Sequence, residues 1–174
     1  MTRIADIRTE RLRLRKARPD DLAAFHSILS DDVAMTYWSS MPHTDLEQSR
    51  IWLQGMIDIP PDEGEDFVVE HEGRVVGKAG LYRFPEIGFI FHPDCWGRGF
   101  AAEALTPILQ RAFERHGLDS VEADVDPRNR RSLGLLQKLG FREIGRRART
   151  WLIGGNWCDS VDLRLLPSDF QASA

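Results

Sequence analysis

The sequence predicts a mixed α/β domain built on a central, mostly antiparallel sheet of six to seven strands, with one parallel pair and about four flanking helices. Short alternating segments separated by turns between residues 67 and 91 predict an antiparallel meander. The order strand, helix, strand, helix between residues 87 and 139 predicts one parallel pair joined by a crossover. A chain of 174 residues has the length of one domain, which we expect to span residues 1–174.

The first half of the chain contains most of the expected sheet. Residues 11–15 alternate arginine and leucine, the period-two pattern of a strand with one buried face. A proline and two aspartates at residues 19–21 favour a helix start, and apolar residues at helical spacing continue to residue 29. Thr44 and Glu47 have the spacing of a capping box and predict a helix to residue 57. Strands are then expected at residues 67–69, 75–82 and 87–91.

The second half alternates helices and strands before a final hairpin. Residues 99–116 have the apolar stripe of a helix packed on a sheet, and Gly117 is a stop signal. A strand is expected at 121–125 and a helix at 132–139, closed by Gly140. Residues 141–153 and 157–166 then predict a long hairpin around a glycine-rich turn.

Composition and charge exclude several classes of protein. Hydrophobic residues make up 42% and charged residues 29%, values typical of globular domains rather than disordered chains. The net charge of −4 argues against a nucleic-acid or membrane-surface partner. Two cysteines and the lack of clustered cysteines and histidines predict neither a disulfide framework nor a metal site. The first sixteen residues lack an apolar core of a leader peptide, so we expect a cytoplasmic protein.

The segment between the strand at 87–91 and the following helix is a candidate anion site. It contains Gly97 and Gly99 immediately before the helix, where backbone can approach a ligand closely. The free N–H groups of a first helical turn point at such a ligand with the positive end of the helix dipole. A single glycine pair also suits an ordinary turn, so the pattern is weak by itself.

A second segment, about thirty residues later, strengthens this interpretation. Residues 128–149 contain eight arginines or lysines against one acid, Glu143, in an otherwise acidic protein. The cluster follows a second strand that would lie beside the glycine turn. A solvated basic helix explains the charge but not its position.

Together these residues resemble a known family. The run Trp96-Gly97-Arg98-Gly99-Phe100-Ala101, followed by Asn129, Ser132 and Gly140-Phe141, is similar to the GCN5-related N-acetyltransferases (GNAT). Within that family it looks like the branch containing the ribosomal-protein N-terminal acetyltransferases RimJ and RimL, in which a tryptophan at the position of Trp96 is common. The resemblance extends over nearly the whole chain.

The resemblance implies acetyl-CoA as co-substrate and a parallel strand pair that splays apart to bind it. The pyrophosphate would lie on the amides at the glycine turn, and strand amides near Ile90 and Phe91 would hold the pantetheine arm. Asn129 and Ser132 would contact the arm or its sulfur end. The implied cofactor-binding residues are Ile90, Phe91, Trp96, Gly97, Arg98, Gly99, Phe100, Ala101, Asn129 and Ser132.

Acyl transfer to an amine needs a neutral nucleophile, a stabilised oxyanion and a stabilised or protonated thiolate. As general base we rank Asp124 first, on the strand lining the cleft, and Glu86 second. Both also suit ordinary strand-end carboxylates. Many relatives have a tyrosine acid where this chain has Leu136, so Ser132 or water would replace it, or the thiolate would leave unprotonated. Cys95 is more simply a small buried residue than a nucleophile.

The acceptor is expected to be a primary amine, either a protein N-terminus or a small molecule, bound by the early helices and the final hairpin. A non-catalytic acyl-CoA-binding module remains an alternative. A nicotinamide-dependent oxidoreductase is a weaker one: Gly97, Gly99 and Ala102 fit a dinucleotide fingerprint, but too few parallel strands follow. We expect the chain to act as a monomer or homodimer.

Overall fold

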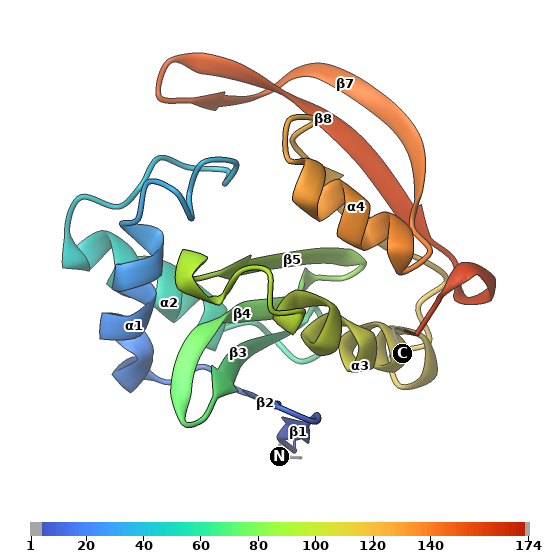
Figure 1. Cartoon of the computed structure of the whole chain (residues 1–174), viewed down its shortest axis with the longest axis horizontal. Coiled ribbons are helices and arrows are strands. Elements are labelled where there is room, and N and C mark those ends of the chain that lie inside the picture. The colour runs from blue at the N-terminus through green and yellow to red at the C-terminus, as the bar shows by residue number, and fades with distance from the viewer. Residues whose placement is uncertain (1–4, 173–174) are drawn as a thin grey trace.

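Eight strands form one mixed sheet in the computed structural model, which describes residues 5–172 of the chain. Their order across the sheet is β1-β2-β3-β4-β5-β6-β8-β7 (Figure 1). The strands are β1 (Ile7–Arg8), β2 (Leu12–Arg15), β3 (Glu65–His71), β4 (Arg74–Arg83), β5 (Glu86–Phe91), β6 (Val121–Val125), β7 (Arg142–Ile153) and β8 (Asn156–Leu165). The α-helices of this part of the chain are α1 (Leu22–Leu29), α2 (Leu46–Ile57), α3 (Phe100–Glu114) and α4 (Arg130–Lys138).

The mixed fold class, the four helices and the single parallel pair are confirmed, but the sheet has eight strands rather than six to seven. The additional strand, β1, has only two residues and pairs with β2 through Ile7 and Arg8. Two residues cannot display an alternating pattern, so the sequence does not reveal it. Residues 1–4 lie outside the described residues, and the expected lack of a leader peptide remains an expectation there.

Some element starts differ from the sequence-based expectation; α4, for example, begins at Arg130 rather than at residue 132. Strand β3 begins at Glu65, two residues before the expected start, and both Glu65 and Asp66 are buried and ion-paired. Helix α2 is capped by Asp45 rather than Thr44: Asp45 Oδ1 accepts from the Gln48 backbone N–H at 2.9 Å. Gln48 Oε1 accepts in turn from the N–H of Thr44, the residue before the cap, at 2.8 Å, so the expected box of Thr44 and Glu47 is replaced by bonds between Gln48 and residues 44 and 45.

Helices cover both faces of the sheet and create two apolar cores. Helices α3 and α4 pack with one face of the strands, and α1 and α2 with the opposite face (Figure 1). Alternate positions on β5 therefore point into different cores, Phe91 towards α3 and Ile90 towards α1 and α2. Each large side chain that is fully buried in these cores contributes about 1.5–3 kcal/mol.

The parallel pair β5–β6 is joined by the crossover through α3, and every other recorded strand pair is antiparallel. Beyond β6 the chain adds an antiparallel hairpin instead of further parallel strands. A doubly wound dinucleotide-binding sheet is therefore absent from residues 5–172, and the nicotinamide oxidoreductase alternative is wrong.

The hairpin β7–β8 arches beyond the rest of the sheet and reaches the loop between α1 and α2 (Figure 1). At its turn, a Cβ added to Gly154 would lie only 2.6 Å from Met41 Sδ in that loop. The hairpin tip and the α1–α2 loop are therefore in contact, and they enclose one side of the sheet.

Candidate active site

Strands β5 and β6 form an opening where the ladder of the sheet is interrupted. They pair at only one position, Glu86 with Glu122, and the Glu122 N–H donates to Pro85 O at 2.9 Å. From there to Phe91 the strands are unpaired with each other, over a length of about 17 Å at 3.3 Å per residue. The splayed pair that the family resemblance implied is present.

The direction of the β5 amides identifies which of them face this opening. His92 N–H donates to Val76 O on β4 at 2.9 Å, and hydrogen-bonding direction alternates along an antiparallel ladder. The Ile90 amide therefore also faces β4, whereas those of Phe89 and Phe91 face the opening. Of the two expected amide positions, the geometry favours Phe91 over Ile90.

The turn before α3 has the backbone geometry of an anion cradle. Gly97 and Gly99 have φ values of +74° and +77°, in the left-handed region that favours glycine. Residues 97–99 are exposed, and a Cβ at Gly97 would meet nothing within 4 Å. The Glu103 N–H donates to Gly99 O at 3.1 Å, so the amides of residues 100–102 have no partner within the helix.

One acidic residue, Glu103, lies beside the cradle, and its charge is balanced by other residues of the chain. Glu103 accepts from Thr9 Oγ1 at 2.6 Å and from the backbone N and Nε of Arg11, both at 2.7 Å. Burial alone would raise the pKa of Glu103, but these hydrogen bonds lower it overall. The guanidinium groups of Arg11 and Arg98 lie 4.8 and 4.5 Å from the Phe100 ring centroid. The ionised Glu103 is thus neutralised by Arg11, while Arg98 has no ion pair among the described residues.

Trp96 connects the cradle to the opening. Its indole Nε1 donates to Phe91 O at 2.9 Å, and the Arg131 guanidinium from α4 lies 5.2 Å from its ring centroid. Trp96 thereby occupies the carbonyl of Phe91 and leaves the amide of the same residue facing the gap.

Asn129 and Ser132 lie at the start of α4, on the far side of the opening. Asn129 caps the helix, its Oδ1 accepting from the Ser132 N–H at 3.2 Å. Of the basic residues after position 127, several are neutralised by nearby acids; Arg130, Arg131, Lys138 and Arg149 have no ion pair among the described residues. Arg149 lies on β7 with its guanidinium 5.0 Å from the Trp157 ring centroid, whereas the other three lie on α4. The α4 cations are therefore the candidates to meet a phosphate at the opening.

A cavity of about 310 Å³ lies at the closed end of the opening, on the sheet face opposite α3 and α4. Carboxylates from three strands line it: Glu86, Glu122, Asp124 and Asp162. Both Asp162 oxygens accept from Arg147. The other three each have one oxygen without a hydrogen-bond partner in the described part of the chain, namely Glu86 Oε1, Glu122 Oε2 and Asp124 Oδ1.

Glu86 is held at the point where β5 and β6 meet. Its Oε2 accepts from Tyr82 Oη at 3.1 Å and from Arg83 Nε at 2.9 Å, and its side chain is 32% exposed. Burial, reinforced by the neighbouring Glu86 carboxylate, raises the pKa of Tyr82 to about 12. Tyr82 therefore stays protonated and donates at neutral pH.

Asp124, the first-ranked base, is held by the hairpin. Its Oδ2 accepts from Arg147 Nη2 at 3.2 Å and from Trp151 Nε1 at 3.1 Å. Ser132 lies at the other end of the opening, so the three expected catalytic side chains are not all gathered in one cluster: Glu86 and Asp124 share the cavity and Ser132 does not line it.

The structure also shows the surroundings of Leu136 and Cys95, the two positions at which the sequence offers no catalytic group or a doubtful one. Leu136 is fully buried in the core under α4, so no acid replaces the tyrosine at that position. Burial raises the pKa of the Cys95 thiol, which makes it a poor nucleophile. Among residues 5–172, no cluster of three or more histidine, cysteine or acidic side chains has the arrangement of a metal site.

Sequence reasoning missed Tyr82, Arg147 and Asp162; it expected the acceptor near Trp151 on the final hairpin, but not the hydrogen bond from Trp151 to Asp124. Tyr82 ends an alternating segment and has no motif around it. Arg147 is one of several arginines in its strand, and nothing in the pattern separates it from its neighbours. The signal that could have found Asp162 is its place on the outward face of an alternating strand beside the strand of Asp124.

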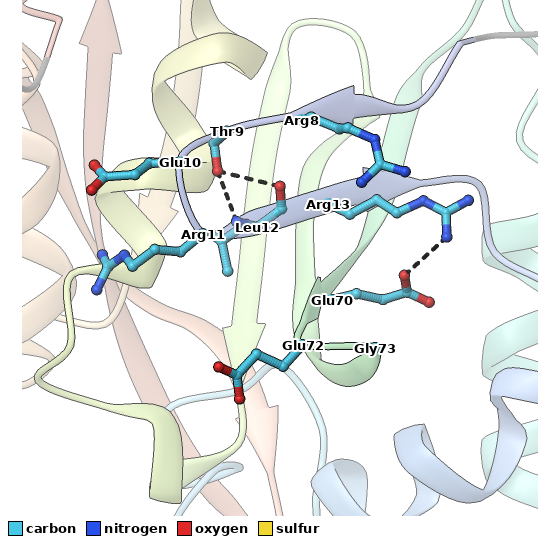
Figure 2. Close-up of a pocket in the computed structure, with 9 residues that line it drawn as sticks. All are labelled: Arg8, Thr9, Glu10, Arg11, Leu12, Arg13, Glu70, Glu72 and Gly73. Carbon is cyan, nitrogen blue, oxygen red and sulfur yellow. Dashed lines mark hydrogen bonds and ion pairs between the residues drawn. The ribbon is translucent and has the colours of Figure 1, made fainter.

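A second hollow, of about 320 Å³, lies at the sheet edge between the β1–β2 turn and the β3–β4 turn (Figure 2). Figure 2 shows Arg13 paired with Glu70 across it. Arg11 on its rim pairs with Glu103 on α3. Its lining contains no residue of β5 or β6, so it lies apart from the splayed strands.

Comparison with known proteins gives a consistent result. The family model described as acetyltransferase (GNAT) domain matches residues 11–142. An N-acetyltransferase called p20 of Bacillus licheniformis is 32% identical over 147 residues, 79% of this chain and 82% of its own. Spermidine N(1)-acetyltransferase of Escherichia coli is 24% identical over 169 residues, 92% and 89% of the two chains. The ribosomal protein uS5-alanine N-acetyltransferase of Escherichia coli is 30% identical over 124 residues, 71% and 62%.

Solved structures agree with the fold. An acetyltransferase of the GNAT family from Bacillus anthracis superposes with a TM-score of 0.79 at 27% identity, covering 93% of this chain and 98% of the other. A spermidine N-acetyltransferase from Vibrio cholerae, in complex with CoA and spermine, gives 0.79 at 23% identity, covering 92% and 98%. No helix within residues 5–172 is both long and apolar enough to cross a bilayer.

Proposed function

The chain belongs to the GNAT family of acetyltransferases, in its RimJ/RimL-like branch, and is an N-acetyltransferase; from this premise we propose that it transfers acetyl from acetyl-CoA directly to a cationic primary amine. We further propose that residues 1–174 act as one cytoplasmic domain, as a monomer or homodimer. Family membership favours this enzyme over a non-catalytic acyl-CoA-binding module.

The observation that carries the proposal is the interrupted ladder between β5 and β6, with the glycine turn at one end and the carboxylate cavity at the other. We propose that the pyrophosphate lies on the free amides from Gly97 to Ala101. The pantetheine arm would run along β5 to the point where the strands meet. There the thioester would meet an amine that enters from the carboxylate cavity, on the sheet face opposite α3 and α4.

Each cofactor contact then has a protein group of suitable chemistry. The Phe91 amide faces the opening and would donate to a carbonyl oxygen of the arm, whereas Ile90 contributes mainly its buried side chain. The Asn129 side-chain N–H₂ and the Ser132 hydroxyl would donate from α4. Arg98, Arg130 and Arg131 supply the positive charge for the phosphates.

The reaction needs no covalent enzyme intermediate. The protonated amine gives a proton to Asp124, with Glu86 as the alternative base, and its nitrogen lone pair attacks the thioester carbonyl carbon. The carbon–sulfur bond breaks, CoA leaves as thiolate, and the nitrogen loses its second proton to solvent as the amide forms. The thiolate is protonated from solvent or by Ser132, so one proton is released overall for each acetyl group transferred.

The cavity favours an acceptor with more than one positive charge. Three carboxylates that line the same space each have an unpartnered oxygen, and one ammonium group can satisfy only part of them. Among the acceptors of relatives, a polyamine such as spermidine fits this arrangement better than the single ammonium of a protein N-terminus. The protein N-terminus is the second candidate.

The cofactor site is tested by Gly99→Glu, which places bulk and negative charge in the cradle. Calorimetry should show loss of acetyl-CoA binding, while the melting temperature falls by only a few degrees, because a Cβ there meets just Arg11 Nη2 at 3.5 Å. Gly117→Glu is the matched control, because Gly117 has φ +61° at the other end of α3 with nothing within 4 Å. Equal affinity in both variants would refute the site assignment.

The acceptor is tested by mass spectrometry of products from spermidine, 1-aminobutane and a peptide with a free N-terminal alanine. CoA release should be fastest with spermidine. Faster acetylation of the peptide would favour the second candidate, and no CoA release with any amine would refute the transferase proposal for these acceptor classes.

A further inference from the structure

We infer that Arg147, held by Asp162, is a positioning residue that fixes Asp124 for the acceptor amine. The inference rests on the proposed function, because it assigns a role in the chemistry of the same cavity. It concerns side chains of the final hairpin, which reach the reaction site only because β7 is bulged.

The bulge is visible in the register of the hairpin. Arg147 pairs with Ser160 and Trp151 pairs with Cys158, so four steps along β7 oppose only two along β8. Arg149, within the bulge, has φ +54°, and its N–H donates to Asp159 Oδ1 at 2.9 Å. In a regular strand the Cα atoms of Arg147 and Trp151 would be about 13 Å apart. The bulge shortens that separation and re-aims both side chains.

Both side chains converge on one oxygen. Arg147 Nη2 and Trp151 Nε1 donate to Asp124 Oδ2 at 3.2 and 3.1 Å. Asp124 Oδ1 is left without a partner in the described part of the chain, and Asp124 is one of the residues that line the cavity. The carboxylate is therefore anchored through one oxygen and open through the other, as a base that must approach a substrate at a fixed angle requires.

Asp162 makes this anchor rigid. It is the direct cross-strand partner of Asp124, and it binds Arg147 through two bonds, from Nε at 2.6 Å and from Nη2 at 2.7 Å. A bidentate pair fixes the plane of the guanidinium. One arginine thus serves two carboxylates, tightly on Asp162 and more loosely on Asp124. The looser bond leaves Asp124 able to accept a proton.

Other ionisable groups around Asp124 are Glu122 on β6, Glu86 on β5 and Tyr82 on β4, each with its own hydrogen-bonding partner. None of these side chains bonds to Asp124 in the described residues. The charge balance at Asp124 therefore depends chiefly on Arg147 and Asp162.

The test compares Arg147→Met, Arg147→Lys, Asp162→Asn and Asp124→Asn in steady-state acetylation of spermidine. Arg147→Met should lower kcat at least about tenfold, because displacement of a catalytic group costs rate steeply, and leave the affinity for acetyl-CoA unchanged by calorimetry. Arg147→Lys should recover part of kcat. In the Asp124→Asn background, Arg147→Met should cost no further activity, because both changes remove the same function.

The pH profile of kcat/KM separates positioning from a merely structural role. Removing the cation in Arg147→Met makes neighbouring carboxylates easier to protonate, so the acid limb should move to higher pH. Removing the competing anion in Asp162→Asn should move it to lower pH. Arg146→Met is the matched control, because Arg146 is adjacent on β7 and pairs only with Glu143 outside the cavity.

The outcomes are distinguishable. Wild-type kcat in Asp124→Asn would refute the base assignment in the proposed function. Loss of activity in Asp124→Asn combined with wild-type kcat in Arg147→Met would overturn the inference alone. Equal losses in Arg147→Met and Arg146→Met, with no movement of the acid limb, would assign Arg147 to hairpin stability and also overturn it.

Discussion

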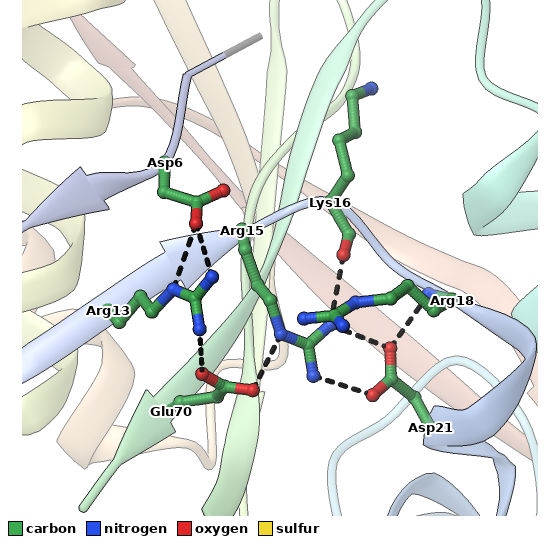
Figure 3. Close-up of polar contacts among 7 residues, drawn as sticks. All are labelled: Asp6, Arg13, Arg15, Lys16, Arg18, Asp21 and Glu70. Carbon is green, nitrogen blue, oxygen red and sulfur yellow. Dashed lines mark hydrogen bonds and ion pairs between the residues drawn. The ribbon is translucent and has the colours of Figure 1, made fainter. Parts of the chain in front are cut away.

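Arg15 is the centre of a buried ion network, and its replacement by methionine provides a quantitative test of how the sheet edge is held. Figure 3 shows Arg15 between Asp21, which precedes α1, and Glu70 on β3. It donates to Asp21 through two bonds of 2.7 and 2.9 Å and to Glu70 at 2.6 Å. The side chains of Arg15, Asp21 and Glu70 are 6%, 5% and 11% exposed.

The magnitude follows from what the substitution leaves behind. In Arg15→Met, Asp21 keeps only the Arg18 N–H at 2.8 Å, and Glu70 keeps only Arg13 at 3.4 Å. Two buried carboxylates thus lose their main cation, and breaking a buried pair in this way costs about 3–5 kcal/mol. For a chain of this length, a loss of about 3 kcal/mol lowers the melting temperature by roughly 6–12 °C.

The assay is thermal and urea denaturation followed by circular dichroism. Arg13→Met is the control, because Arg13 pairs with Asp6 and Glu70 but is 37% exposed, and such pairs contribute about 0–1 kcal/mol. Adding Asp21→Asn and Glu70→Gln to Arg15→Met should restore part of the stability, since no buried charge then remains. A loss in Arg15→Met no larger than that in Arg13→Met would refute the reasoning.

Two further predictions concern stability elsewhere. Burial alone would raise the pKa of Glu65, but hydrogen bonds from Arg111 and His116 lower it overall. The ionised Glu65 therefore contributes fully to the free energy of unfolding when the pH is above its unfolded-state pKa of about 4.3. This contribution disappears as the pH falls through the lower pKa of the folded state. Glu65→Gln should lower the melting temperature at pH 7, and the deficit should shrink below about pH 4.3; a deficit that grows with acid would contradict this sign. Gly140→Ala should destabilise by more than about 3 kcal/mol, because its Cβ would lie 1.9 Å from Asp169 O at φ +106°. Gly134→Ala, inside α4 and with nothing within 4 Å, should change little or stabilise by up to about 1 kcal/mol, and similar results for both glycines in urea denaturation would contradict the packing argument.

The fold could be predicted from the sequence wherever one face of an element is buried. The alternation of residues 11–15 and the stripe of α3 give the correct elements because burial selects apolar residues at the structural period. The pattern fails at β1, which is too short, and at Glu65 and Asp66, which are buried as ion pairs with Arg111 and Lys78. A charged residue whose partner is distant in sequence looks exposed until the partner is placed beside it.

The candidate site is predictable to the same extent. The glycine turn is local, since Gly97 and Gly99 need their neighbours only, and the resemblance to GNAT proteins leads directly to it. The anchor of Asp124 is not local. It depends on Arg147 and Trp151, whose convergence requires a bulge that contains no glycine and is therefore not signalled in the sequence.

Several polar groups at the site have one atom that is hydrogen-bonded within the protein and a second atom without a hydrogen-bond partner in the described residues. Asn129 uses its side-chain carbonyl oxygen to cap α4, and its side-chain N–H₂ has no partner within residues 5–172. Phe91 uses its carbonyl for Trp96 while its amide faces the opening. Asp124 lines the cavity and uses Oδ2 for the hairpin, while its Oδ1 has no partner within residues 5–172. A structural role and a ligand role are therefore compatible at these positions rather than alternatives. Because the satisfied atom fixes the orientation of the remaining one, the structural role would itself prepare the group for the ligand, and loss of either Asn129 or Arg147 should disturb positioning before it disturbs the fold.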